Sequence, residues 1–224
     1  MPSKYTQRNF QRGHFYHICN RGGRSQKIFI DDQDYKTFTD ILSYYLTYPL
    51  GKPLSQIYRK NYQHPNVKGR TLDMETPTYQ LVCYCLMPTH PHLLIKQSDS
   101  PTSNNNISDF MKRLTVTYTL YFNQRHGLSG SLYQGKFRNV RTKTNEQLLY
   151  LSKYIHLNPK SPSKHPHSSL PIFIGQSPTP KWLHPEEILE LNYYKNSTNP
   201  QKNYQNFIFD SKPTPKSISQ LTLE

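Results

Sequence analysis

The sequence predicts an α+β fold, an antiparallel sheet with helices packed on it. Hydrophobic residues repeat with the period of two that is typical of strands and the longer period that is typical of helices, in the order β-α-β-β-α-β-α. A short turn at Pro88-Thr89 joins the second and third strands, and strands joined by so short a turn run antiparallel. Strands and helices therefore do not alternate strictly, as they would in a parallel sheet.

The first strand and the first helix are predicted within residues 14–48. Residues 14–19 alternate in the manner of a strand and end at the turn signal Asn20-Arg-Gly-Gly23. Residues 31–34 (Asp-Asp-Gln-Asp) supply the cap and first-turn acids of a helix that runs to about Tyr48. Residues 49–75 are polar, contain proline and glycine, and are predicted to form an insertion or a long loop.

The next three elements are predicted at residues 78–86, 90–96 and 107–125. The strand at 78–86 is apolar on both faces, which predicts a covered strand in the centre of the sheet. Residues 90–96 return as its antiparallel partner after the turn. The helix at 107–125 ends before Gly127, and one apolar stripe marks its buried face: Phe110, Leu114, Tyr118 and Tyr121.

The last strand and helix are predicted at residues 135–142 and from Thr144 onward. Thr144-Asn-Glu-Gln147 fits a capping box, and the helix must end by Asn158 because Pro159 disfavours helical geometry in the residue before it. Ten of the 18 prolines lie from residue 159 onward. We therefore expect a domain over residues 1–160 and a Pro-rich extension over 161–224, in which a short piece at 182–191 is ordered and the end is disordered.

The charge of the chain predicts a polyanionic partner. The formal net charge is +14, and 18 tyrosines and 10 phenylalanines offer rings on which unpaired bases can stack. Residues 1–30 and 110–145 contain basic residues and no acids, which favours a surface that follows phosphates. The candidate DNA-binding residues are Arg21, Lys112, Arg113, Lys136, Arg138 and Arg141.

The three cysteines do not indicate a disulfide framework. Cys83 and Cys85 lie in an apolar run and are predicted to be small core residues in a reducing compartment. No apolar run approaches the length of a membrane span, and the N-terminus lacks the apolar region of a signal peptide. We expect a soluble cytoplasmic protein, associated with the nucleoid and with no membrane partner.

Two histidines mark a candidate metal site. In Cys85-Leu-Met-Pro-Thr-His-Pro-His-Leu-Leu-Ile95, His90 and His92 are two residues apart on a strand and therefore share a face. Tyr150, Tyr154 and Asn158 share a face of the last helix at a spacing of four. If that face lies over the histidines, the amide oxygen of Asn158 can bind the same cation. Two imidazoles, one amide oxygen and open positions suit Mg²⁺ or Mn²⁺ better than a closed zinc site.

The tyrosines of the last helix give this metal site a possible chemistry. A cation can polarise a phosphodiester, and a tyrosine can attack phosphorus and remain bound to it. The two candidates are Tyr150 and Tyr154, and the spacing to Asn158 favours Tyr154. His165-Pro-His167 repeats the histidine spacing in a Pro/Ser-rich segment with no strand around it, so it is assigned no metal role.

Six short motifs in order make the chain resemble the single-tyrosine HUH transposases, and among them the REP-associated tyrosine transposases. They cover roughly residues 14–160, and Trp182-Leu-His-Pro-Glu-Glu-Ile188 resembles the family's C-terminal extension. The motifs are Tyr16-His-Ile-Cys-Asn-Arg-Gly22, Ile28-Phe29, Tyr84-Cys-Leu-Met-Pro-Thr-His-Pro-His92, Tyr121-Phe-Asn123, Leu132-Tyr-Gln-Gly-Lys-Phe137 and Tyr154-Ile-His-Leu-Asn-Pro159.

The resemblance implies a ferredoxin-like HUH fold and a DNA transposase that cleaves single-stranded DNA beside hairpins. Tyr154 would be the nucleophile that becomes linked to a 5′-phosphate and frees a 3′-OH, so that strands can be rejoined during recombination. His90, His92 and Asn158 would bind Mg²⁺ or Mn²⁺. Family members are monomers, or homodimers that exchange the tyrosine helix, and both remain open here.

Two positions depart from the family pattern. Pro91 stands where a bulky apolar residue is usual between the histidines, and it has no N–H to offer a sheet ladder. Thr89 stands where asparagine is usual. Two alternatives remain. Pro91 favours an impaired or domesticated relative that binds DNA hairpins without cleavage, and the short His-x-His motif also fits a metal-dependent hydrolase that uses water.

Overall fold

The computed structural model describes residues 8–48, 54, 78–99, 106–191, 199–210, 218 and 221–223. Strands β1 (Phe15–Cys19), β2 (Tyr79–Met87), β3 (His90–Gln97) and β4 (Arg138–Arg141) form one antiparallel sheet in the order β2-β3-β1-β4. Helix α1 (Asp32–Thr47) joins β1 to β2, and α3 (Ile107–His126) joins β3 to β4. This β-α-β-β-α-β order is that of ferredoxin-like folds and confirms the predicted α+β class.

Side chains at the helix ends explain where the helices begin and end. The Asp31 carboxylate accepts the Asp34 N–H at the start of α1, and the Asn106 side chain accepts the Ser108 N–H at 2.8 Å at the start of α3. Gly127, in the left-handed conformation at φ 65°, ends α3 as the sequence predicts. Each of these contacts satisfies a backbone group that the helix itself leaves unpaired.

Helix α4 (Asn145–Leu157) also begins and ends where the sequence predicts. Thr144 accepts the Gln147 N–H at its start, and Asn158 is its C-cap. The Gln147 side chain accepts the N–H of Lys143 at 2.8 Å, one residue before the usual partner in a capping box.

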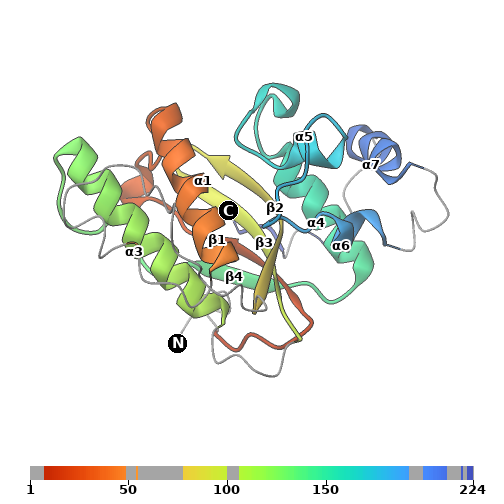
Figure 1. The fold of residues 1–224 in the computed structure, drawn as a ribbon, viewed down its shortest axis with the longest axis horizontal. Coiled ribbons are helices and arrows are strands. Elements are labelled where there is room, and N and C mark those ends of the chain that lie inside the picture. The colour runs from red at the N-terminus through yellow and green to blue at the C-terminus, as the bar shows by residue number, and fades with distance from the viewer. Residues whose placement is uncertain are drawn as a thin grey trace.

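The sheet is covered on both faces (Figure 1). Helices α1 and α3 pack on one face, where Leu93 and Ile95 of β3 join their hydrophobic core. The intervening residue Leu94 points to the other face and packs with Leu151 and Ile155 of α4. Because side chains alternate along a strand, His90 and His92 share the face of Leu94 and lie on the α4 side.

The prediction that β2 is central was wrong, although the prediction that it is covered is confirmed. β2 is an edge strand, and the C-terminal segment pairs with its outer edge. The His184 N–H donates to the Leu81 carbonyl at 2.9 Å, and the Leu86 N–H donates to the His167 carbonyl at 2.9 Å. The strand is apolar on both faces because each face packs in a hydrophobic core, and the later segment pairs with the edge that would otherwise be open.

More of the C-terminal extension is ordered than predicted. It contains α5 (Leu170–Phe173), α6 (Glu186–Leu189) and α7 (Pro200–Phe209), and α7 lies in the part that was expected to be disordered. Phe173 and Tyr204 are buried in the cluster that contains the buried face of α4. The described residues on the two sides of position 160 therefore share one hydrophobic core.

Two further sequence predictions concern the insertion at residues 49–75 and membrane spans. The predicted insertion at residues 49–75 lies outside the described residues, apart from Leu54, which is buried. Within the described residues, no helix is both long enough and apolar enough to span a membrane.

Candidate active site

His90 and His92 converge on one point, as their spacing predicts. They lie on β3 and are 6% and 0% exposed, and their Nε2 atoms are 2.9 Å apart. Two nitrogen ligands in adjacent octahedral positions, each about 2.1 Å from the same ion, would be about 3.0 Å apart. The two lone-pair positions therefore fit a shared cation.

Cys19 joins this pair across the sheet. It is paired in register with His92, and its sulfur and one nitrogen of each histidine lie within 4.8 Å of one another. Sequence reasoning did not single out Cys19, because only the register of β1 against β3 brings it to the histidines. A thiolate would add a soft ligand to the site, which bears on the choice of metal.

The second ring nitrogen of each histidine also has a partner. His90 Nδ1 is 2.8 Å from the hydroxyl of Thr89, and His92 Nδ1 is 2.8 Å from Nε2 of His17. His17 Nδ1 lies 2.6 Å from the carbonyl oxygen of Leu221. Such outer contacts fix the orientation of metal-binding imidazoles.

Burial keeps His92 neutral. Its pKa lies well below the ordinary value, because burial disfavours the charged ring and the nearby His17, His90 and Arg21 add to this effect. A metal ligand must offer a lone pair, which the neutral ring has and the protonated ring lacks.

Tyr154 lies beside the histidines within the same chain. Its ring centroid is 5.7 Å from that of His92 and 6.0 Å from that of His17, with the rings nearly perpendicular. Tyr150 instead packs on Phe207 of α7, with ring centroids 5.3 Å apart. Of the two candidate tyrosines, Tyr154 is thus the one next to the histidine pair.

Asn158, the third predicted metal ligand, occupies the C-cap of α4. It follows Tyr154 by four residues and is partly buried. Four residues are about one helical turn, so the side chains of Tyr154 and Asn158 start from the same side of α4.

Pro91 fits the strand without loss of a ladder hydrogen bond. It pairs with Leu86, one position from the Met87–His90 pair that closes the turn. Hydrogen-bonded and non-hydrogen-bonded pairs alternate in antiparallel sheets, so Leu86–Pro91 is of the second kind and needs no N–H toward β2. On the other side, the pairing of β3 with β1 ends at His92.

The six predicted DNA-binding residues divide into two groups. Lys112 and Lys136 are exposed, and Arg21 is partly exposed and close enough to His92 to affect its pKa. The other three make contacts within the protein. Arg113 lies 4.5 Å over the ring of Tyr45, Arg138 donates to the Leu223 carbonyl at 2.9 Å, and Arg141 donates to the side chain of Gln11.

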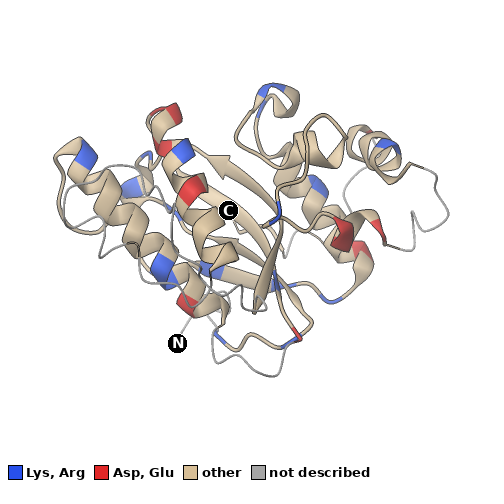
Figure 2. Cartoon of the chain, in the orientation of Figure 1, with Lys and Arg blue, Asp and Glu red and all other residues tan. Residues whose placement is uncertain are grey.

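Charge is unevenly distributed over the described residues (Figure 2). Acidic side chains gather on α1 and α6, and α3 and α4 each carry one in the first turn, Asp109 and Glu146. Arg125 of α3 pairs with Asp34 of α1 and with its N-cap Asp31. The strands that carry the histidines contain no acidic residue. A phosphate would therefore meet no carboxylate from β1 or β3.

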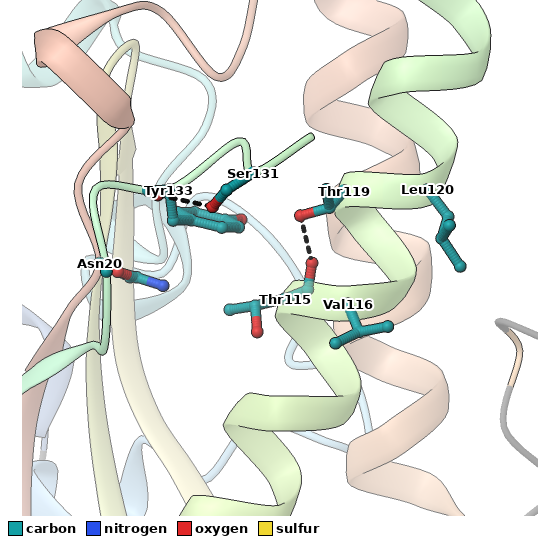
Figure 3. A pocket seen from close by; sticks show the side chains of 8 residues that line it. Asn20, Thr115, Val116, Thr119, Leu120, Ser131 and Tyr133 are labelled. Atoms are coloured by element: carbon teal, nitrogen blue, oxygen red, sulfur yellow. Dashed lines mark hydrogen bonds between the residues drawn. The ribbon is translucent and has the colours of Figure 1, made fainter. Parts of the chain in front are cut away.

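A cavity of about 290 Å³ lies between α3 and the segment that precedes β4 (Figure 3). Tyr133 belongs to the core on the α1/α3 face, so the cavity is separated from the histidines by the sheet. The residues that line it are Asn20, Thr115, Val116, Thr119, Leu120, Ser131, Tyr133 and Gly135.

Comparison with known proteins finds similarity among solved structures alone. No protein-family model matches the sequence, and no curated protein matches it. A REP-associated tyrosine transposase bound to a REP hairpin is similar at 13% identity and a TM-score of 0.49, over 78% of this chain and 87% of that chain. A candidate transposase from Deinococcus radiodurans R1 is similar at 16% identity and a TM-score of 0.35, over 66% and 93% of the two chains.

Proposed function

We propose that the chain is a metal-dependent endonuclease and strand transferase that acts on single-stranded DNA beside hairpins. Tyr154 would form a covalent 5′-phosphotyrosine. The observation that carries this proposal is the position of Tyr154, whose ring lies 5.7 Å from the ring of the paired histidine His92. The basic charge of the chain and the motifs shared with single-tyrosine HUH transposases support DNA as the substrate.

His90, His92 and Asn158 would hold Mg²⁺ or Mn²⁺ in this reaction. When bound, the cation would polarise the phosphodiester and stabilise the leaving 3′-oxygen. The Nε2 atoms of His90 and His92 lie 2.9 Å apart, close to the separation expected for two nitrogen ligands of one ion. The nearby Cys19 would distinguish this site from an all-oxygen magnesium site.

Tyr154 would attack the phosphorus in line with the leaving 3′-oxygen. A bond from the phenol oxygen to phosphorus forms as the bond from phosphorus to the 3′-oxygen breaks. The phenol loses its proton to solvent and the 3′-oxygen gains one. Because the ordinary pKa of tyrosine is near 10, loss of this proton needs the positive potential of the site. Attack of a 3′-OH on the phosphotyrosine reverses the step and joins strands.

A hairpin oligonucleotide with single-stranded flanks and Mn²⁺ or Mg²⁺ tests this proposal. We expect a protein–DNA adduct that survives denaturation, and loss of the adduct in Tyr154→Phe. Tyr150→Phe is the matched control, because Tyr150 packs on Phe207 away from the histidines, and it should keep the adduct. His90→Ala should abolish adduct formation.

Two other results would support the alternatives. Cleavage that persists in Tyr154→Phe would indicate a hydrolase in which water attacks the phosphorus. Tight binding of the hairpin with no adduct under either metal would indicate a relative that binds without cleavage. Pro91 gives this second alternative little support, because the strand accommodates the proline at a position that needs no N–H.

A further inference from the structure

A continuous line of hydrogen bonds links the C-terminal segment to the candidate metal site. It runs from the Leu221 carbonyl to His17 Nδ1, from His17 Nε2 to His92 Nδ1, and from His92 Nε2 to His90 Nε2, at 2.6, 2.8 and 2.9 Å. It ends at the Thr89 hydroxyl, 2.8 Å from His90 Nδ1. His17 and His92 are fully buried, so no bulk water competes along this line.

The carbonyl at one end fixes where the protons lie. A backbone carbonyl can only accept, so His17 Nδ1 must donate to Leu221. A neutral imidazole carries a single N–H, so His17 Nε2 must accept, and it accepts from His92 Nδ1. The lone pair of His92 is then on Nε2, which faces His90.

We propose that His17 is a positioning residue that, with the Leu221 carbonyl, holds His92 in the tautomer that can bind a metal through Nε2. The proposal deepens the proposed function and rests on its metal site. In water, neutral histidine prefers the opposite tautomer, with the proton on Nε2, and that form would block the shared position. The C-terminal segment thus contributes to a site more than 120 residues before it in sequence.

The tautomers can be measured directly by ¹⁵N NMR of the histidine rings in full-length protein treated with a chelator. We expect both His17 and His92 to carry the proton on Nδ1. In His17→Phe, His92 loses its acceptor and should move its proton to Nε2. His17→Gln is the conservative variant, because its amide oxygen can replace the accepting Nε2, and it should restore the Nδ1–H form of His92. A wild-type His92 protonated on Nε2 would overturn the proposal.

Metal affinity gives a second readout. Loss of an outer partner of a metal-binding histidine typically weakens binding about 10–100-fold. By calorimetric titration with Mn²⁺, we expect a weakening of this order in His17→Phe and a much smaller one in His17→Gln. Both variants should be compared at temperatures below their thermal unfolding. Equal Mn²⁺ affinities in wild type and His17→Phe, with both folded, would contradict the positioning role.

Two truncated chains separate the carbonyl from the rest of the segment. A chain that ends at Thr222 keeps the Leu221 carbonyl within a peptide bond and loses the Leu223 carbonyl that contacts Arg138. A chain that ends at residue 220 loses the acceptor as well. We expect the Nδ1–H form of His92 in the first chain and its loss in the second. Retention of that form in the second chain would exclude a role for Leu221.

The tautomer of His92 and the Tyr154 adduct test the role of His17 and the nuclease activity separately. If wild type forms the Tyr154 adduct but His92 carries its proton on Nε2, the positioning role is wrong and the nuclease stands. If His92 has the expected tautomer but no metal binds and no adduct forms, the nuclease is wrong.

Discussion

The hydroxyl of Thr89 stands where a metal-binding histidine needs an outer partner, 2.8 Å from Nδ1 of His90. The hydroxyl can accept a hydrogen bond from Nδ1–H when His90 offers its Nε2 lone pair, and it can donate a hydrogen bond to Nδ1 when His90 carries its proton on Nε2. Thr89 therefore supplies the outer partner for the second ring nitrogen of His90. Two neighbouring positions, Thr89 and Pro91, thus depart from the pattern without disturbing the pair of Nε2 atoms.

His156 shows that a histidine beside the candidate nucleophile can have a purely structural role. It is fully buried and lies 2.8 Å from both the Tyr204 hydroxyl and the Ser169 hydroxyl. Burial lowers the pKa of His156 to about 3. His156 thus joins α4 to the C-terminal extension.

The low pKa of His156 predicts a pH dependence of stability. Between pH 6.5 and about 3, the unfolded chain binds a proton on this residue that the folded chain does not, so stability is complete above pH 6.5 and falls as the pH is lowered. The free energy of unfolding should decrease by about 2 kcal/mol from pH 6 to pH 4 through this group. Urea unfolding at pH 6 and pH 4 measures this decrease, and the His156→Gln variant should lack the part that His156 contributes. An equal loss in both proteins would show that His156 does not carry it.

At the scale of elements, local signals located the helices and strands, and long-range pairing decided their neighbours. The caps Asp31, Asn106 and Thr144 and the proline after Asn158 act within one turn, so the sequence predicts the helix ends. The edge position of β2 depends on a segment about 100 residues later, which no local pattern reveals. For the same reason, no local pattern indicates that Cys19 and His17 lie beside the histidine pair, because this depends on the register of β1 against β3.

Helix α4 carries the candidate nucleophile to the histidines of its own chain, which predicts action in cis. Its buried face packs against Cys83, Cys85 and Leu94 of the same sheet that carries the histidines. In hybrid dimers of Tyr154→Phe and His90→Ala chains, purified through two different tags, we expect no adduct. A regained adduct would mean that α4 of one subunit serves the histidines of the other, since only that arrangement combines an intact tyrosine with an intact pair.

At the scale of the whole molecule, the formal net charge is +14, and most of the basic residues lie outside the candidate catalytic site. Some of the basic side chains are paired within the protein, as Lys36 is with Asp40 on α1. Lys112 and Lys136, in contrast, are exposed and lie in the acid-free stretch of the sequence. Exposed lysines are the side chains that can replace the counterions of a phosphate backbone.

This division predicts which residues set the salt dependence of DNA binding. Each phosphate contact on a single strand contributes about 0.7 to the slope of log affinity against log salt concentration. In the cleavage-deficient Tyr154→Phe background, Lys112→Gln and Lys136→Gln should each reduce the slope by about that amount. Lys36→Gln should leave the slope unchanged, because Lys36 already pairs with Asp40. Fluorescence anisotropy of a labelled flanked hairpin across a salt series measures the slopes. Equal slopes in all three variants would place the DNA path away from α3 and the segment before β4.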